Sequence, residues 1–218
     1  MASSTLNSAR VRATPLKDQN RTALTAVLLV NLVVLVLLVQ TGQLTAPSID
    51  QFVQQWRHLL PAGIGVVFAG VINGLLSPFA KARLVFWRWS NPLPGSFAFS
   101  RYAARDPRID LAALRHMIKV WPSDPHEQNA LWYRLYKSVE SEPAVIDAHR
   151  SFLLTRDYTA IAFLVLLAAG PLGLWFLSAK LAAIYGSIML LQYLLARQAA
   201  SNYGVRFVTT VLALKASK

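Results

Sequence analysis

Four long apolar segments, none of which contains a charged residue, constrain the fold of this chain more than any other feature. They occupy residues 22–40, 59–78, 159–177 and 181–196 of the 218-residue sequence. A helix of about 20 apolar residues crosses the hydrocarbon core of a bilayer, and it satisfies its own backbone hydrogen bonds there. The sequence therefore predicts an all-α membrane protein with four transmembrane helices.

The third and fourth segments should form an antiparallel helical hairpin, because only Ser178, Ala179 and Lys180 separate them. The third segment also contains Gly170-Pro171, a pair that would kink a helix but that membrane helices tolerate. We expect these two segments to cross the bilayer in opposite directions.

The distribution of basic residues predicts the side on which each end of the chain lies. The sequence has 22 Lys and Arg against 10 Asp and Glu, and its net charge is +12. With four crossings, all basic residues except Arg57 and Lys180 fall on one side, which the positive-inside rule assigns to the cytosol. Both termini, residues 1–21 and 197–218, are then cytosolic, and the predicted location is a bacterial inner membrane. Residues 1–17 are rich in Ser and Arg like a mitochondrial transit peptide, so the mitochondrial inner membrane is the alternative.

The connections between the segments differ greatly in length. Residues 79–158 are long enough to form a small domain, and they are predicted to be a basic, aromatic-rich helical insert in the cytosol. Residues 41–58 form an outer loop, in which a capping-box pattern over residues 48–51 predicts a short interfacial helix. The apolar tail 203–214 is too short to span, and it packs either against the insert or at the inner interface.

Local signals predict where helices begin within the insert. Asp110 and Asp124 are N-cap candidates, the first for a helix over residues 111–121. Residues 141–143, Ser-Glu-Pro, predict the start of another helix that continues without a break into the third apolar segment. The Pro- and Gly-containing residues 91–100 are expected to form an ordered loop and not a strand.

The sequence contains no recognisable catalytic or metal-binding motif. The absence of cysteine excludes disulfides and cysteine nucleophiles, and there is no Gly-rich phosphate-binding loop. The histidines have no paired spacing typical of metal ligands: His58, His116, His126 and His149. We therefore predict no catalytic residue, no metal site and no cofactor.

Three amides lie inside the apolar segments: Asn31, Asn73 and Gln192. A polar amide in hydrocarbon needs a partner, so each should face another helix or water. They either form interhelical hydrogen bonds or line a narrow pore in a homo-oligomer. Gly70-x-x-x-Gly74 would allow a close helix approach, within one chain or between chains. No apolar segment contains an ionisable residue, which argues against ion-coupled transport but leaves a channel possible.

Aromatic residues alternate with basic ones from KARLVFWRWSNPLPG, residues 81–95, through the insert. Aromatic rings can stack on bases and arginines can neutralise phosphates, which is typical of proteins that bind single-stranded nucleic acid or nucleotides. The predicted ligand-binding residues are Arg83, Trp87, Arg88, Trp89, Arg101 and Arg134. The alternative is an aromatic and basic anchor at the inner interface, in contact with anionic lipid headgroups.

In span number, chain length and basic cytosolic part, the chain resembles the membrane components of bacterial anti-phage defence systems such as Hailong or Kiwa. This resemblance implies an oligomeric effector whose spans form a gated pore, with an insert that senses a nucleic-acid or nucleotide signal. Two other hypotheses remain open. The first is a non-catalytic scaffold that anchors a soluble protein partner. The second is a lipid-modifying or lipid-binding enzyme, which loss of phospholipid turnover on mutating Asp106 or His116 would favour.

Overall fold

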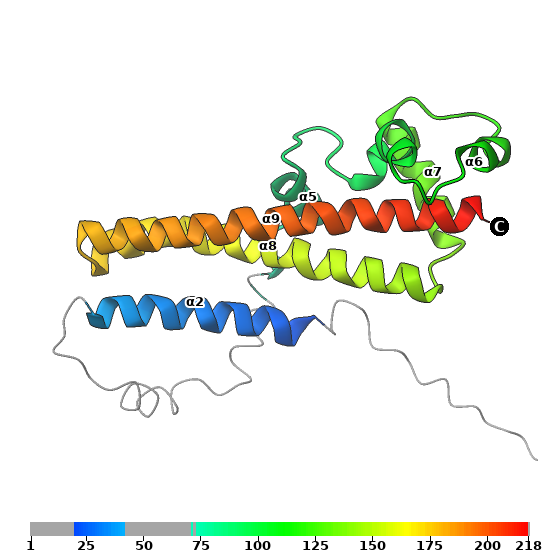
Figure 1. Ribbon diagram of the computed structural model, residues 1–218. Helices are drawn as coiled ribbons and strands as arrows, with labels where there is room; N and C mark the ends of the chain where they lie inside the picture. Colours follow the sequence, from blue (N-terminus) through cyan, green and yellow to red (C-terminus); the bar gives the residue numbers. More distant parts are fainter. Residues whose placement is uncertain (1–19, 42–70, 72, 218) are drawn as a thin grey trace, which may run out of the picture.

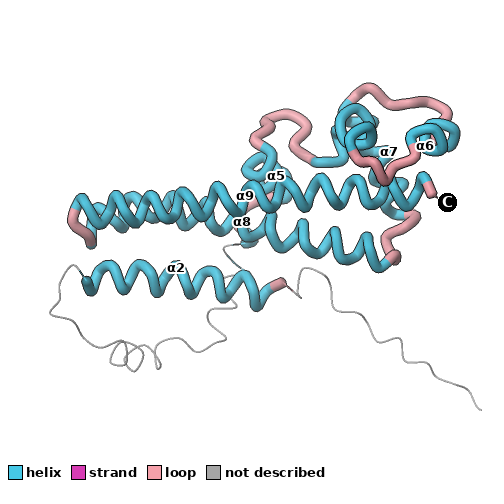
Figure 2. Tube along the Cα trace, in the orientation of Figure 1, coloured by secondary structure: helices cyan, strands magenta, loops and turns pink. Residues whose placement is uncertain are grey.

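The computed structural model describes residues 20–41, 71 and 73–217. In this part of the chain the elements are helices and helical turns, without a β-strand (Figure 2), which confirms the all-α prediction. The α-helices are α2 (Arg21–Thr41), α5 (Pro78–Phe86), α6 (Leu111–Met117), α7 (Pro125–Lys137), α8 (Pro143–Phe176) and α9 (Ala179–Ala216). The shorter turns are η1 (Pro94–Phe97), η2 (Ala98–Tyr102) and η3 (Ala103–Arg105).

Helices α8 and α9 form the antiparallel hairpin that the short connection predicts (Figure 1). The Ser178 hydroxyl caps α9 by accepting a hydrogen bond from the Leu181 backbone N–H. The two helices approach closely near this turn, because a Cβ atom on Gly173 would lie 3.3 Å from the Cβ of Ala182. As predicted, α8 begins in the insert at Pro143 and continues without a break through Pro171 into the third apolar segment.

Both hairpin helices are long and apolar enough to cross a membrane. At 1.5 Å per residue each measures about 50 Å or more, whereas a bilayer core is about 30 Å thick. The distribution of exposed residues divides α9 accordingly. Exposed apolar side chains occur up to Leu195, whereas Ala200 and residues 207–212 are buried. The predicted fourth span and the predicted tail are therefore one helix, and the tail packs against the insert.

The insert folds over the C-terminal half of α9 (Figure 1), and its helices begin where local signals predict. The Asp110 carboxylate accepts hydrogen bonds from two backbone N–H groups at the start of α6, and Asp124 does the same for α7. Helix α6 ends at Met117, earlier than predicted, because Ile118 adopts an extended conformation.

Residues 91–100 differ from the predicted loop, because most of them form the helical turns η1 and η2. The buried Gln128 side chain explains this local structure. Its Oε1 accepts hydrogen bonds from the backbone N–H groups of Phe99 and Ser100, at 3.2 and 3.0 Å. A partner 28 residues away thus satisfies backbone groups that a π-helical turn would otherwise leave unpaired.

Aromatic side chains fill the core between the insert and the hairpin. The ring of Phe207 stacks on His149 with centroids 4.6 Å apart, and Trp132 meets the same ring edge-on at 5.2 Å. Tyr136 and Phe152 complete this cluster. Such pairs contribute about 0.5–1.5 kcal/mol each beyond their burial. Much of the aromatic content of the insert is therefore structural core, which leaves fewer rings for a ligand.

Helix α2 coincides with the first predicted span and lies along the hairpin (Figure 1). The Asn20 amide, just before α2, donates a hydrogen bond of 3.2 Å to the Arg150 carbonyl oxygen of α8. The predicted interfacial helix at residues 48–51 and most of the predicted span 59–78 lie outside the described residues.

Candidate functional site

The three amides of the apolar segments all form hydrogen bonds within the chain. Asn31 Nδ2 donates to the Val27 carbonyl of the preceding turn at 2.8 Å, and Gln192 Nε2 donates to the Tyr158 hydroxyl at 3.1 Å. Asn73 is buried and bonds to two charged side chains. The contacts of Asn73 and Gln192 agree with the interhelical role, whereas the Asn31 hydrogen bond stays within α2. The pore-lining role depends on an assembly of several chains and stays a prediction.

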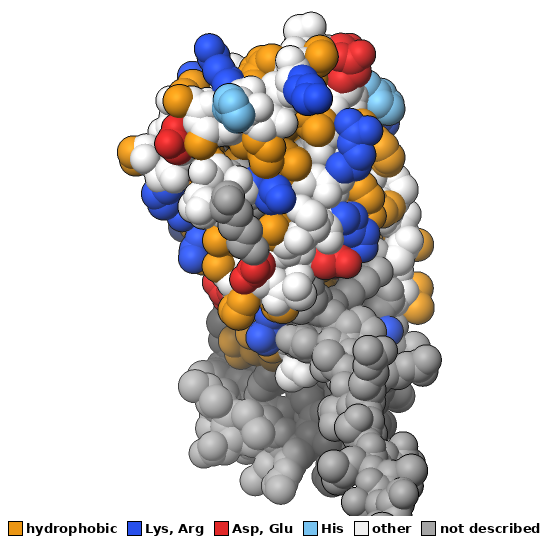
Figure 3. Space-filling model, turned by 90° about the vertical axis from the view of Figure 1, so that its right-hand side faces the viewer, with side chains coloured by type: hydrophobic (Ala, Val, Ile, Leu, Met, Phe, Trp, Pro, Cys, Tyr) orange, Lys and Arg blue, Asp and Glu red, His pale blue; other side chains and the backbone are white. Residues whose placement is uncertain are grey.

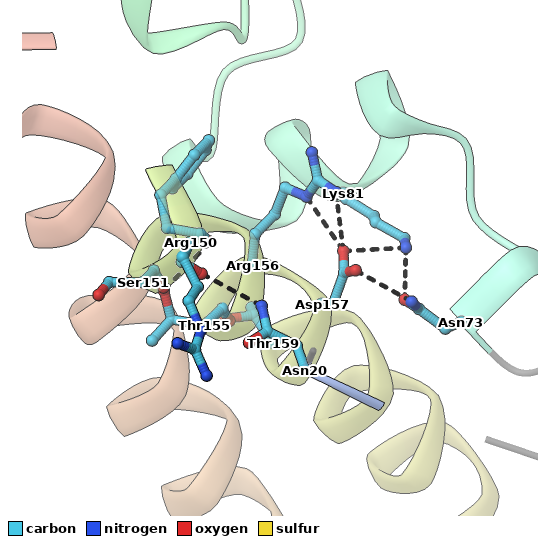
Figure 4. A network of polar contacts seen from close by, with 10 residues as sticks. Asn20, Asn73, Lys81, Arg150, Ser151, Thr155, Arg156, Asp157 and Thr159 are labelled. Atoms are coloured by element: carbon cyan, nitrogen blue, oxygen red, sulfur yellow. Dashed lines mark hydrogen bonds and ion pairs between the residues drawn. The ribbon is translucent and has the colours of Figure 1, made fainter. Parts of the chain in front are cut away.

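The partners of Asn73 form a buried charge network that connects α5 to α8 (Figure 4). Lys81 and Asp157 are each 3% exposed, and Lys81 Nζ lies 3.0 Å from Asp157 Oδ1. Asn73 Nδ2 donates to the other carboxylate oxygen at 2.9 Å, and Asn73 Oδ1 accepts a hydrogen bond from Lys81 Nζ. Arg156 completes the network, with Nη2 2.9 Å from Asp157 Oδ1. The network fixes the end of the second apolar segment against the start of the third.

Sequence reasoning missed this pair, because Lys81 and Asp157 fall just outside the apolar segments 59–78 and 159–177. The sequence did contain a signal for the pair. Lys81 follows the second apolar segment and Asp157 precedes the third, so the predicted topology places these opposite charges on the same side of the membrane. A buried ion pair by itself is weak evidence for function. We therefore assign a structural role to this network and no role in ligand binding.

Basic side chains are interspersed with apolar ones over the face drawn in Figure 3, with acidic side chains among them. A candidate anion site is therefore defined by several basic side chains that line the same pocket. One open pocket of about 630 Å³ meets this requirement, between η2, η3 and α9. Five arginines line it: Arg88, Arg101, Arg105, Arg108 and Arg206. Polar side chains of α9 form the opposite wall: Ser201, Asn202 and Thr209.

The acidic residue of this pocket, Asp106, is already neutralised. Arg108 donates two hydrogen bonds to this carboxylate, from Nε at 2.9 Å and from Nη2 at 2.6 Å. Its Nη2 also donates to Thr209 Oγ1 at 3.2 Å. The hydrogen bonds from Arg108 hold the pKa of Asp106 well below its usual range. The Arg108–Asp106 pair therefore joins η3 to α9, and the positive charge of the remaining arginines is left in excess.

The remaining arginines differ in how they are held. Within the part of the chain that the structure describes, Arg101 and Arg105 are exposed, with side chains in no hydrogen bond or ion pair. Arg206 lies 3.8 Å from an exposed Asp147 carboxylate, a weak surface pair. Arg88 is fixed: Nη2 donates to the Tyr102 hydroxyl at 3.3 Å, and its buried Nη1 has no hydrogen-bond partner among described residues.

The structure divides the six ligand-binding residues that the sequence predicts. Arg88 and Arg101 line the arginine pocket, whereas Arg83, Trp87 and Trp89 line a separate cleft that shares only Arg88 with it. Arg134 is exposed on α7 and lines neither. Sequence reasoning did not select Arg105, Arg108 and Arg206. The close spacing of the first two with Arg101 was a usable signal, but nothing local connects Arg206 to them.

The chemistry that this pocket supports is anion binding. Guanidinium groups match the geometry of phosphate and carboxylate oxygens and form charge-assisted hydrogen bonds with them. Among the described residues there is no group of His, Cys, Asp and Glu that could hold a metal ion. Comparisons with protein-family models, curated proteins and solved structures find no match to this chain. The interpretation of the site therefore rests on its geometry.

The Asp106–Arg108 pair predicts a pH-dependent contribution to stability. A carboxylate whose folded pKa is lowered contributes stability above its unfolded pKa, and this contribution is lost as the pH falls toward the folded pKa. We expect Asp106→Asn to lower the free energy of unfolding by about 1 kcal/mol at pH 7. The difference from wild type should narrow below about pH 4, since the unfolded Asp pKa is about 3.9. Thermal unfolding in detergent at several pH values measures this difference, and a constant difference would contradict the assignment.

Proposed function

We propose that the chain spans the inner membrane four times with both termini in the cytosol, and that its cytosolic domain binds a phosphorylated ligand in the arginine pocket. In this proposal, ligand binding controls the permeability of a homo-oligomeric membrane effector. The observation that carries it is the convergence of five arginines on one pocket whose acidic residue is already paired.

The lining of the pocket favours a nucleotide or other small phosphorylated ligand over a single strand of nucleic acid. Strand binding relies on exposed aromatic faces on which successive bases stack. The aromatic residue of the pocket, Tyr102, is only 5% exposed, and the exposed Trp87 and Trp89 lie in the other cleft. The pocket thus offers charge for phosphates and hydroxyl and amide groups for a sugar or base, with no stacking platform.

The position of the pocket supports coupling to the membrane. Its α9 wall extends from Ser201 to Thr209, and the same helix continues without a break into the predicted fourth span, residues 181–196. At 1.5 Å per residue the wall begins only about 7 Å from the end of that span. A ligand that moves η3 relative to α9 would therefore act directly on a membrane helix.

The assembly part of the proposal rests on a row of exposed apolar residues on α9. Ile184, Ile188, Leu191 and Leu195 recur at helical spacing, and each is exposed within the described chain. Lipid, a second copy or a segment outside the described residues would cover such a row. Association of copies through it would place the hairpin helices around a common axis, as a pore requires.

Binding of a fluorescent nucleoside triphosphate to the full chain in neutral-lipid nanodiscs tests the ligand assignment. We expect saturable binding that weakens with salt, and we expect Arg101→Ala/Arg105→Ala to weaken it at least 10-fold, since a hydrogen bond to a charged group contributes about 1.5–3 kcal/mol. Trp87→Ala/Trp89→Ala should bind like wild type, and Lys119→Ala, which removes one exposed charge outside the pocket, serves as the control.

A fluorescent single-stranded oligonucleotide in the same nanodiscs separates the two ligand classes. Tighter oligonucleotide binding that is lost in Trp87→Ala/Trp89→Ala would overturn the pocket assignment in favour of a stacked strand. Absence of binding by either probe would overturn ligand sensing as a whole.

A scaffold for a soluble protein partner is the second candidate function, and one observation favours it. Met117 and Val120, at the end of the insert farthest along α9, are exposed apolar residues. Met117 lines a hollow together with His116 and Lys215. A protein partner would be expected to cover this region without any effect of the pocket arginines on its binding.

A further inference from the structure

A second cleft of about 440 Å³ lies between α5, α8 and α9, next to the arginine pocket. Its inner walls are apolar and come from Leu76, Ala80, Leu84 and Phe163. Its rim carries Arg83 and Arg88 together with two tryptophans, and none of the described residues that line it is acidic. The cleft is therefore amphipathic, with hydrocarbon at one end and positive charge at the other.

The cleft crosses the level at which the predicted spans end. Phe163 and Tyr193 belong to the third and fourth predicted spans, whereas Arg83 and Arg88 follow the end of the second. If the chain is inserted as proposed above, on which this inference rests, the walls formed by Leu76 and Phe163 lie at acyl-chain depth. The arginines then lie at the level of the inner-leaflet headgroups.

Trp87 is held rigidly at this boundary. Its indole Nε1 donates to the Tyr193 hydroxyl at 3.0 Å, and that hydroxyl donates to the Leu84 carbonyl at 3.2 Å. The Arg197 guanidinium covers the ring at 3.8 Å from its centroid. Trp87 also has a φ of 51°, a conformation that bulky residues rarely adopt. The structure thus fixes one wall of the cleft at the expense of local backbone strain.

Other groups at the rim remain available to a ligand. Trp89 is 85% exposed, and its carbonyl accepts a 3.1 Å hydrogen bond from Arg83 Nε, which orients that guanidinium. Arg88, which lines the cleft, has a buried Nη1 with no hydrogen-bond partner in the described chain. Buried guanidinium nitrogens without a partner are costly unless a ligand or water satisfies them.

We infer that this cleft binds an anionic phospholipid of the inner leaflet. One acyl chain lies against Leu76, Ala80 and Phe163, and the phosphate is bound by Arg83 and Arg88. A soluble phosphate would not use the apolar walls, and a zwitterionic lipid would bring its own cationic group close to the two arginines. Arg88 also lines the arginine pocket, so the bound lipid and the proposed cytosolic ligand share one side chain.

Native mass spectrometry of the full chain in detergent, titrated with phosphatidylglycerol and phosphatidylcholine of identical chains, tests this site. We expect wild type to retain phosphatidylglycerol at least 5-fold more strongly. Arg83→Gln should reduce this preference to below 2-fold, and Ala80→Trp, which fills the cleft, should remove the retained lipid. Lys119→Gln removes one positive charge elsewhere and should behave like wild type.

Each contrary outcome has a distinct meaning. Equal retention of both lipids by wild type, or a preference that persists in Arg83→Gln and Ala80→Trp, would overturn the lipid site. Displacement of the lipid by glycerol 3-phosphate alone would overturn it in favour of a soluble anion. Nucleotide binding in neutral nanodiscs reports the arginine pocket separately, and Ala80→Trp should leave it intact. A chain that is soluble without detergent would overturn membrane insertion itself.

Discussion

Replacing Asp157 with leucine while Lys81 is retained should strongly destabilise the folded chain. Lys81 and Asp157 are each 3% exposed, and Asn73 and Arg156 also bond to this carboxylate. Removal of Asp157 takes away the carboxylate that contacts the buried ammonium of Lys81, and breaking a buried ion pair costs about 3–5 kcal/mol. Proteins are stable by only about 5–15 kcal/mol, so this loss is a large fraction of the total.

The double substitution Lys81→Met/Asp157→Leu distinguishes a missing charge partner from a misfit of the new side chain. Since buried ion pairs can often be replaced by apolar residues without loss, the double variant should recover most of the lost stability. Asp147→Leu is the matched control, because Asp147 lies on the same helix but its side chain is 67% exposed. Thermal unfolding in detergent measures all three variants. A double variant as unstable as Asp157→Leu would show that the ion pair is not the reason.

Local features of the fold could be predicted because their causes lie within a few residues. The carboxylates of Asp110 and Asp124 accept hydrogen bonds from backbone N–H groups two and three positions later. The start of each helix can therefore be predicted from a few consecutive residues. The three-residue link between the apolar segments likewise left an antiparallel hairpin as the natural arrangement. Helix α6 ends at Met117, before the predicted end at residue 121. Trp121 packs on Phe99, a contact that local sequence does not reveal.

The candidate site depends on contacts that sequence separation conceals. Lys81 and Asp157 meet across 76 positions, and Arg108 reaches Thr209 across 101. The predicted ligand residues were grouped by composition, which cannot distinguish a stacked core ring from an exposed one. In the structure Trp132 is buried in the core and Trp89 is exposed. Two residues of the same type, each able to stack on a ligand, therefore differ in whether a ligand can reach them.

The same long-range contacts connect both proposed ligand sites to the same helices. The charge network ties α5 to α8, and α5 also carries Arg83 and leads into Arg88. The insert is therefore fixed to the hairpin at one end by the Lys81–Asp157 pair and at the other by the packing of α9. A ligand at either proposed site would act on elements that are joined to the α8–α9 hairpin.

The packing of α9 depends on one glycine, and a single methyl group there should disrupt the joint between the insert and the hairpin. A Cβ atom on Gly204 would lie 2.7 Å from Phe86 Cζ and 2.9 Å from Phe152 Cε2. Both rings are buried, so neither can move without displacing α5 or α8. Overpacking of this kind costs about 1–3 kcal/mol. We therefore expect Gly204→Ala to lower the melting temperature by several degrees.

The chain supplies its own control for this prediction, because Gly186 lies on the same helix with nothing within 4 Å of its added Cβ. Alanine is favoured over glycine in helices by about 1 kcal/mol, so Gly186→Ala should leave stability unchanged or raise it. Opposite signs for the same chemical change on one helix would attribute the loss at Gly204 to the rings of Phe86 and Phe152. Equal effects of the two substitutions would instead contradict the close packing of α5 and α8 on α9. If Gly204→Ala also weakens nucleotide binding while Gly186→Ala does not, the arginine pocket depends on the insert being seated on α9, as its shared wall requires.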